Sequence, residues 1–264
     1  MTPQSLCIVV PVFNEERRLP ALLEALHREA DAIAARAGLQ LVQVVAVDDG
    51  STDGTAELLA AADDLGGRFS VERFPRNRGK GAAVRAGMLR ATTDLVLMTD
   101  VDLSTPLDEL VRLAAKLDEG ADICIASRAH RESDIVVRQP RHRELMGKAF
   151  NVIVRALTRI PWKDTQCGFK LFRLSTARRL FELQRVEGFA FDMELLVLAR
   201  RLGLRVAEVP VRWIDNPDTR VGLLTSSTRM ALDALGIALR ARRPLRALET
   251  AAAEVNPGQG PPRT

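Results

Sequence analysis

Two carboxylates stand one residue apart where an apolar run of the sequence ends. Residues 97–106 read LMTDVDLSTP, so Asp100 and Asp102 directly follow a segment of buried-strand type. Residues i and i+2 of an extended chain point the same way, and a shared cation would relieve the repulsion between the two side chains. Mg²⁺ and Mn²⁺ prefer a few carboxylates together with substrate phosphates. The spacing therefore predicts a metal bound with a nucleoside diphosphate; the alternative is a solvated turn.

Polar residues also follow three other apolar runs. They are Asn14 and Glu15 after residues 6–13, Asp48 and Asp49 at the end of residues 41–48, and Arg128 after residues 121–127. Helical patterns separate the runs, and such alternation predicts a mostly parallel α/β sheet with helices on both faces. Ligands of open sheets bind beyond the carboxyl ends of the strands, so we expect these residues to form one constellation.

The elements that must position these residues follow from hydrophobic periodicity. Strands are expected at residues 6–13, 41–48, 69–74, 94–99, 121–127 and 206–213, with a short strand inside 164–173. Helices are expected at residues 15–36, from 51 to about 65, 81–91, from Pro106 onward, and at 144–159, 175–183, 190–202 and 223–243. Residues 128–143 are expected to form a mobile loop and the tail after Ala253 to be disordered.

Two classes of nucleotide-binding protein are disfavoured. The first apolar run continues as PVFNEE rather than as GxGxxG, and no GxxxxGK[ST] occurs, which argues against a dinucleotide oxidoreductase and a P-loop NTPase. Residues 77–84, NRGKGAAV, place Lys80 between two glycines at an expected helix start, where backbone N–H groups and a lysine can hold a phosphate. A plain helix cap is the alternative for this stretch.

Composition sets the outer limits. The chain has 264 residues, 47% of them hydrophobic, enough for one large α/β domain or two small ones. The net charge of +4 favours an anionic partner only weakly, and no nucleic-acid partner is expected. Three cysteines without a CxxC predict reduced thiols and a cytoplasmic protein. No apolar run approaches the ~18 residues of a membrane span, so we expect a protein that is soluble or that lies on a membrane without crossing it.

The motifs together resemble a known family. VVPVFNE, VDDGSTDGT, NRGKGAAVRAG and DVDLSTP, in this order, are similar to the inverting family 2 glycosyltransferases of the GT-A fold, which is Rossmann-like. DTQCGFKLF, EGFAFDMELL and VPVRW resemble the dolichyl-phosphate β-glucosyltransferases, relatives of the polyprenyl-phosphate mannose synthases. The resemblance covers about residues 5–228. It implies a GT-A domain over residues 1–222, with a nucleotide-binding half (1–127) and an acceptor half (128–222), then an amphipathic helix (223–250) and the tail (251–264).

The resemblance implies a role for each matching residue. Pro11, Val12, Asn14, Glu15, Asp48 and Asp49 would contact the base and ribose. Lys80 would contact the diphosphate, and Asp100, Asp102 and Ser104 would bind the metal, Mg²⁺ or Mn²⁺. Gln166, Gly168 and Phe169 would contact the sugar. Arg128 would engage phosphate or donor sugar, Asp192 and Glu194 would be the acidic pair near the acceptor, and Arg220 would clamp phosphate. Ser104 departs from the family pattern, because relatives often carry Gln there.

The implied reaction is inverting transfer of a hexose, glucose from UDP-glucose, to a polyprenyl or dolichyl phosphate. The alternatives are GDP-mannose as donor and a soluble or cell-wall hydroxyl as acceptor. A phosphate oxygen is already ionised at pH 7, so a general base such as Asp192 or Glu194 is less necessary than for a hydroxyl. These two acids are alternatively plain helix-surface residues. The alternative that is not an enzyme is a nucleotide-binding module that needs no metal.

The expected helix at residues 223–243 combines an apolar side with a basic end. The apolar side comprises Met230, Leu232, Leu235, Ile237 and Leu239, and the basic end comprises Arg240, Arg242, Arg243 and Arg246. Helices of this kind lie in anionic membrane interfaces, which predicts peripheral membrane contact. Packing on the domain or pairing in a homodimer is the alternative.

Overall fold

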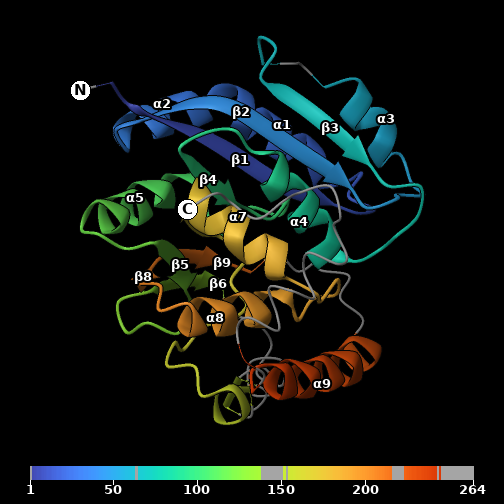
Figure 1. Ribbon diagram of the computed structural model, residues 1–264. Helices are drawn as coiled ribbons and strands as arrows, with labels where there is room; N and C mark the ends of the chain where they lie inside the picture. The colour runs from blue at the N-terminus through green and yellow to red at the C-terminus, as the bar shows by residue number, and fades with distance from the viewer. Residues whose placement is uncertain are drawn as a thin grey trace.

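A seven-stranded sheet lies at the centre of the molecule (Figure 1), and the computed structural model describes residues 2–62, 65–137, 151–152, 154–215, 223–242 and 244. In spatial order the strands are β3 (Phe69–Arg73), β2 (Leu39–Asp48), β1 (Gln4–Val12), β4 (Leu95–Met98), β7 (Lys170–Arg173), β5 (Ile123–Ser127) and β8 (Val206–Pro210). All pairs are parallel except those of β7, which runs antiparallel to both β4 and β5. The predicted mostly parallel α/β sheet is confirmed.

Helices cover both faces of the sheet. One face packs against α4 (Lys80–Arg90), α7 (Leu174–Leu183) and α8 (Phe191–Arg201). The other packs against α1 (Leu19–Arg28), α2 (Ala30–Arg36), α3 (Thr55–Ala60) and α5 (Leu110–Asp118), which follows the 3₁₀ turn η1 (Leu107–Glu109). The strands alternate between these two cores: Val9 lies in the first, whereas Ile8 and Val10 lie in the second. Strands covered on both faces read as continuous apolar runs for this reason.

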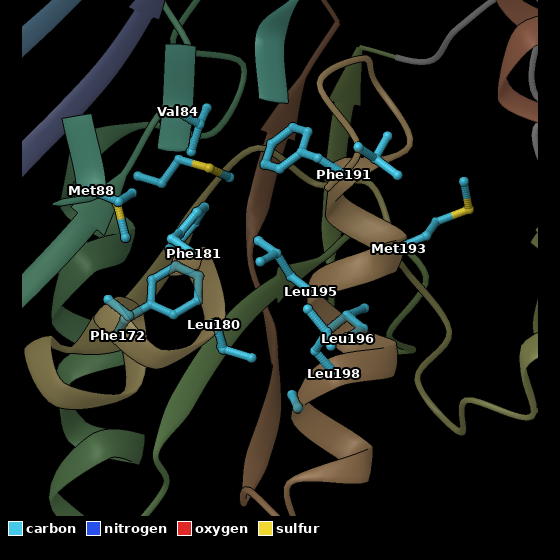
Figure 2. Close-up of a cluster of buried hydrophobic side chains, with 14 of the residues drawn as sticks. Val84, Met88, Phe172, Leu180, Phe181, Phe191, Met193, Leu195, Leu196 and Leu198 are labelled. Carbon is cyan, nitrogen blue, oxygen red and sulfur yellow. The ribbon is translucent and has the colours of Figure 1, made fainter. Parts of the chain in front are cut away.

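The first core is built largely from α4, α7 and α8. Figure 2 shows Val84 and Met88 of α4 facing the aromatic pair Phe172 and Phe181, whose ring centroids lie 5.8 Å apart edge to face. Side chains of α8 such as Phe191 close the cluster. This packing fixes the position of α4, which begins at Lys80.

A second, two-stranded sheet lies beside the main one. It pairs β6 (Asp134–Val137) with β9 (Arg212–Ile214) in parallel. The last described helix, α9 (Leu223–Arg240), packs against α8 at the lower end of the molecule in Figure 1 and buries Ala234 and Ile237. No helix in the described parts of the chain is long and apolar enough to cross a membrane.

Several predicted elements differ in detail. The expected helix 15–36 is two helices that meet at Glu29, whose φ of −121° is not helical. The expected loop 128–143 contains β6, because residues of this segment form hydrogen bonds with β9. The expected strand 206–213 divides between β8 and β9, which belong to different sheets. The helix expected from 51 to 65 is limited to α3. Most of the expected helix 144–159, residues 216–222 and the tail after 244 lie outside the described residues.

Candidate active site

A cavity of about 150 Å³ opens beyond the carboxyl ends of β4 and β5. Its lining comprises Thr99, Asp100, Asp102, Leu103, Ser104, Thr105, Arg128, Gln166, Cys167, Gly168, Phe169, Trp213 and Asp215. Because β7 is antiparallel, its beginning rather than its end reaches this edge of the sheet. The chain after β4, the chain after β5 and the chain before β7 therefore meet at one place, where the sequence predicted a site.

Asp100 lies against the backbone of Gly168. A Cβ atom at position 168 would come within 2.0 Å of Asp100 Oδ2, so only glycine leaves room for this carboxylate. On its other side, Asp100 Oδ1 pairs with Lys80 Nζ at 2.7 Å. Burial acts to lower the pKa of Lys80, but the carboxylates of Asp100, Asp192 and Asp102 outweigh it and raise that pKa. Lys80 is thus a firmly charged ammonium beside the cavity.

Asp102 is held by the backbone of a short loop and lies near the guanidinium of Arg18. Its Oδ1 accepts the backbone N–H of Ser104 at 2.9 Å, and its Oδ2 lies 3.9 Å from Arg18 Nη1. Arg18 is in turn held by two hydrogen bonds to the carboxylate of Glu15, at 2.5 and 2.6 Å. Burial raises the pKa of Glu15, with Arg18 opposing the shift. Glu15 therefore acts on the cavity through Arg18 rather than as a lining residue.

The donor set fits a hard divalent cation. Asp100 and Asp102 present carboxylate oxygens to one cavity, and Ser104 adds a hydroxyl to its lining. Within the described part of the chain no three His, Cys, Asp or Glu side chains converge as a ready-made metal cage. Two carboxylates with the remaining positions left to phosphate and water is the arrangement that Mg²⁺ prefers, and Mn²⁺ accepts the same oxygens.

The acids after β2 bind loops of the protein itself. Asp48 is fully buried; its Oδ1 accepts the N–H of Ser51 at 2.8 Å and its Oδ2 lies 3.1 Å from Arg73 Nε. The carboxylate of Asp49 accepts three bonds from residues 77–79: from Asn77 Nδ2 at 2.9 Å, from the Arg78 N–H at 2.7 Å and from the Gly79 N–H at 2.8 Å. Burial raises the pKa of Asp49, against these bonds. Neither carboxylate lines the cavity.

The residues that follow β1 join this loop network. Asn14 has a left-handed φ of 54°; its N–H donates to Ser51 Oγ at 2.9 Å and its Oδ1 accepts the Thr52 N–H at 2.8 Å. Val12 points its side chain into the core, while its carbonyl accepts the Asp49 N–H. Pro11, half-buried in β1, precedes it. The predicted base and ribose residues thus lie together, outside the lining of the cavity.

Arg128 lines the cavity and is bound by Asp164, a residue that the sequence analysis did not single out. Asp164 accepts Arg128 Nε at 2.7 Å, Nη2 at 2.8 Å and the Arg128 N–H at 2.8 Å. Burial acts to raise the pKa of Asp164, but the Arg128 charge and hydrogen bonds outweigh it and hold that pKa at about 2. The guanidinium also lies 5.5 Å from the ring centroid of Trp213. Asp164 and Trp213 belong to the motifs DTQCGFK and VPVRW, which was the available signal.

The acidic pair of α8 does not reach the cavity. Asp192 forms a buried ion pair with Lys170, another residue that the sequence reading missed. Burial raises the pKa of Asp192, although Lys170 and Lys80 oppose the shift. Glu194 accepts the N–H groups of Arg185 at 2.9 Å and Val186 at 2.7 Å, and burial raises its pKa too. Arg220 lies outside the described residues.

Comparison with known sequences decides the family. The profile described as "Glycosyl transferase family 2" matches residues 7–181, more than half of the chain. The chain belongs to glycosyl transferase family 2. The resemblance drawn from the motifs is thereby confirmed, and the DVDLSTP stretch that supplies Asp100 and Asp102 lies inside the matched region of this family 2 transferase.

The family 2 transferase has curated relatives with one recurring name. A dolichyl-phosphate beta-glucosyltransferase of Drosophila melanogaster is 35% identical over 243 residues, 89% of this chain and 74% of its own length. One from Trichomonas vaginalis is 35% identical over 236 residues, covering 88% and 70%. The Homo sapiens protein of the same name is 32% identical over 245 residues, covering 90% and 76%.

Solved structures resemble the family 2 transferase in fold. Glucosyl-3-phosphoglycerate synthase from Mycobacterium tuberculosis, in complex with Mn²⁺, uridine diphosphate and phosphoglyceric acid, superposes with a TM-score of 0.65 at 20% identity, covering 91% of this chain and 80% of its own. A complex of the same synthase with Mn²⁺ and UDP-glucose gives a TM-score of 0.60 at 18% identity, covering 88% and 79%. The predicted fold class is confirmed by this likeness.

Proposed function

We propose that this protein transfers glucose from UDP-glucose, with inversion, to the phosphate of a polyprenyl lipid such as dolichyl phosphate. The observation that carries the proposal is one cavity that holds both the Asp100–Asp102 carboxylate pair and the Arg128 guanidinium. The first suits a metal with a donor diphosphate, and the second suits an anionic group of donor or acceptor. The name shared by the curated relatives supplies the lipid phosphate and the sugar.

Asp100, Asp102 and the hydroxyl of Ser104 would hold Mg²⁺ or Mn²⁺. When bound, the metal supplies Lewis-acid neutralisation of the leaving diphosphate. Lys80, 2.7 Å from Asp100, adds a second positive charge on the same side. Asn14, Glu15, Asp48 and Asp49 order the loops beyond β1 and β2 against which base and ribose would lie, with Pro11 and Val12 beside them.

Arg128 binds anions within the cavity and is aimed by Asp164. Its fork is engaged with Asp164 along Nε and Nη2, which leaves Nη1 and the second N–H of Nη2 for a ligand. Gln166, Gly168 and Phe169 line the same cavity as Arg128 and Asp100 and would bound the sugar. Arg220 stays a prediction as a further phosphate clamp.

Proton abstraction is a small part of this reaction. A lipid phosphate oxygen is ionised at neutral pH, so orientation and charge neutralisation supply the rate enhancement. This agrees with the position of Asp192, whose carboxylate is paired with Lys170 rather than exposed to the cavity. The residues that carry the chemistry are therefore cations and metal ligands.

A donor and acceptor screen tests the proposal. Purified protein is incubated with UDP-glucose or GDP-mannose, with Mn²⁺, Mg²⁺ or EDTA, and with or without a polyprenyl phosphate in detergent. We expect metal-dependent glucolipid formation from UDP-glucose. Formation of mannolipid from GDP-mannose would show that GDP-mannose, rather than UDP-glucose, is the donor. Transfer to phosphoglyceric acid in place of the lipid phosphate would refute the proposed acceptor.

We also propose that α9 rests on the inner face of a membrane, where the acceptor lipid is reached. Leu232, Leu235 and Leu239 are 71%, 48% and 55% exposed and follow one another at helical spacing, and Arg240 and Arg242 follow them. Such a face suits an anionic interface. Replacing the three leucines by serine should abolish flotation with anionic liposomes, and unchanged flotation would contradict the membrane placement. If the unmodified protein is a dimer and the serine variant is a monomer, the leucine face instead binds a second copy of the chain.

A further inference from the structure

The two glycines beside Lys80 are in contact with one short loop. We call residues 184–188, between α7 and α8, the bracing loop. A Cβ at position 79 would lie 2.4 Å from the Glu187 carbonyl oxygen, and a Cβ at position 81 would lie 2.5 Å from the Val186 carbonyl oxygen. The loop backbone therefore reaches both flanks of Lys80, and glycine is required at both flanks to admit it.

Hydrogen bonds tie the bracing loop to the first turn of α4. The Ala82 N–H donates to the Glu187 carbonyl at 3.1 Å. Gln184 Nε2 donates to the Gly81 carbonyl at 3.0 Å and to the Val186 carbonyl at 2.8 Å. The Gln184 side chain is 2% exposed, so these bonds are shielded from water. The first turn of α4 and the bracing loop thus form one unit.

The carboxylate of Glu194 holds this unit from behind. Its Oε2 accepts the N–H groups of Arg185 and Val186, at 2.9 and 2.7 Å. Its Oε1 meets Arg240 Nη2 of α9 at 3.2 Å. The side chain is 6% exposed, and each oxygen is engaged by a donor of the protein. A carboxylate so placed fixes backbone and does not approach a substrate proton.

Asp49 performs the corresponding task on the other side of Lys80. It accepts the Arg78 and Gly79 N–H groups, as described above. Lys80 therefore lies between two backbone segments, each anchored by a buried carboxylate from a different part of the chain. The outcome is the 2.7 Å contact between Lys80 Nζ and Asp100 at the rim of the cavity.

We infer that Glu194 is a positioning residue: it holds the bracing loop, the bracing loop holds the first turn of α4, and that turn sets Lys80 for the donor diphosphate. The identity of the ligand that Lys80 meets rests on the proposed function, whereas the brace itself does not. Through Arg240, the same carboxylate links the Lys80 turn to α9.

The test compares Glu194→Ala and Glu194→Gln by two readouts. The first is amide hydrogen exchange at Val186 and Ala82 without ligand, and the second is steady-state kinetics with UDP-glucose, Mn²⁺ and polyprenyl phosphate. We expect E194A to speed exchange at both amides and to raise KM for UDP-glucose about tenfold with kcat within about threefold. E194Q keeps an acceptor oxygen for the two N–H groups, so it should restore most of both properties.

Asp122→Ala is the matched control. Asp122 also accepts a backbone N–H, that of Arg205 at 2.8 Å, but it lies at the amino end of β5, away from the cavity. It should leave both readouts unchanged. Arg240→Met, which keeps the Glu194 carboxylate, should raise the donor KM by a smaller factor and remains informative if E194A does not fold.

Two results would overturn the inference. One is equal loss of kcat in E194Q and E194A together with loss of the acidic limb of the kcat–pH profile, since that is the behaviour of a proton carrier. The other is unchanged exchange at Val186 and Ala82 in E194A. A wild-type protein that transfers from no donor refutes the proposed function instead, and the exchange experiment then still decides the brace.

Discussion

Two acid pairs with the same spacing have different surroundings in this molecule. Asp100 and Asp102 follow β4, and both line the cavity. Asp192 and Glu194 begin α8 and diverge, because residues two apart on a helix are turned by about 200° from one another. Asp192 meets Lys170, and Glu194 meets the bracing loop. The expected extended backbone at Asp100–Asp102 is not found: both lie in a turn after β4, in which the Leu103 N–H approaches the Asp100 carbonyl oxygen at 3.5 Å. This turn places both carboxylates at the cavity, so the i, i+2 spacing alone does not indicate whether two acids share a ligand.

Exposure separates the pairs further. The side chains of Asp100 and Asp102 are 33% and 18% exposed, so water or an incoming metal can reach them. Asp192 and Glu194 are almost fully buried, and their charges are compensated by protein donors. Buried carboxylates without such partners would cost several kcal/mol each. The first pair is therefore available for ligands, whereas the second belongs to the structure.

The largest expected effect is on catalysis by the cavity pair. Asp102→Ala should lower transfer about a thousandfold at saturating Mn²⁺, because a metal ligand supplies several kcal/mol of charge stabilisation. Initial rates with UDP-glucose measure it, and the melting temperature should fall by only a few degrees. D122A serves as the control. Near-normal transfer by D102A would remove the basis for separating the two pairs.

The largest expected effect on stability lies at the helix pair. Lys170→Met leaves Asp192 buried without its partner, which should cost roughly 3–5 kcal/mol in urea-induced unfolding. The double variant K170M/D192N buries no charge at this point and should recover much of the loss. Wild-type stability for K170M, or a double variant as unstable as the sum of the single ones, would show that the two do not act as a pair.

A glycine offers a finer test of the cavity pair. Gly168→Ala brings a methyl group to within 2.0 Å of Asp100 Oδ2, so the carboxylate must move. A shift of about 1 Å in a metal ligand should reduce kcat/KM about a hundredfold. Gly236→Ala in α9 is the control, since its new Cβ would lie 3.6 Å from Arg240 Nη1, an ordinary van der Waals distance. Equal activity in both variants would contradict the close approach.

The smallest effect is on the pH dependence of stability. The folded pKa of Asp164, about 2, lies below its unfolded value of about 3.9, so the unfolded state binds more protons between these values. Its contribution of about 2 kcal/mol is full above pH ~4 and lost as the pH falls through about 2. Urea unfolding between pH 2 and 5 should therefore show a flatter acid slope for Asp164→Asn.

Glu194 should give the opposite slope. Its folded pKa is raised, so the folded state binds more protons, and stability from this group falls as the pH rises above the unfolded value. Glu194→Gln should remove that fall. If D164N and E194Q change the pH profile in the same direction, the contrast between a carboxylate paired with Arg128 and one buried among N–H donors is wrong.

The first half of the chain was more predictable than the second. From β1 to β4, each strand is followed by its own helix, so local apolar patterns locate the elements and parallel pairing brings the strand ends to one edge. In the second half, β7 enters between β4 and β5 in the antiparallel direction, and β9 leaves the main sheet to pair with β6. Those pairings join residues far apart in sequence, and no local pattern encodes them.

The family, the α/β fold and seven of the residues that line the cavity could be predicted from the sequence, because motif order and strand ends are local properties. The seven are Asp100, Asp102, Ser104, Arg128, Gln166, Gly168 and Phe169. Only the tertiary structure decided which acids meet a ligand and which hold the protein together. Asp164 with Arg128, Lys170 with Asp192, and Glu194 with the bracing loop are contacts across 36, 22 and eight residues of sequence. A carboxylate's role depends on the donors that burial places around it, and spacing alone does not specify them.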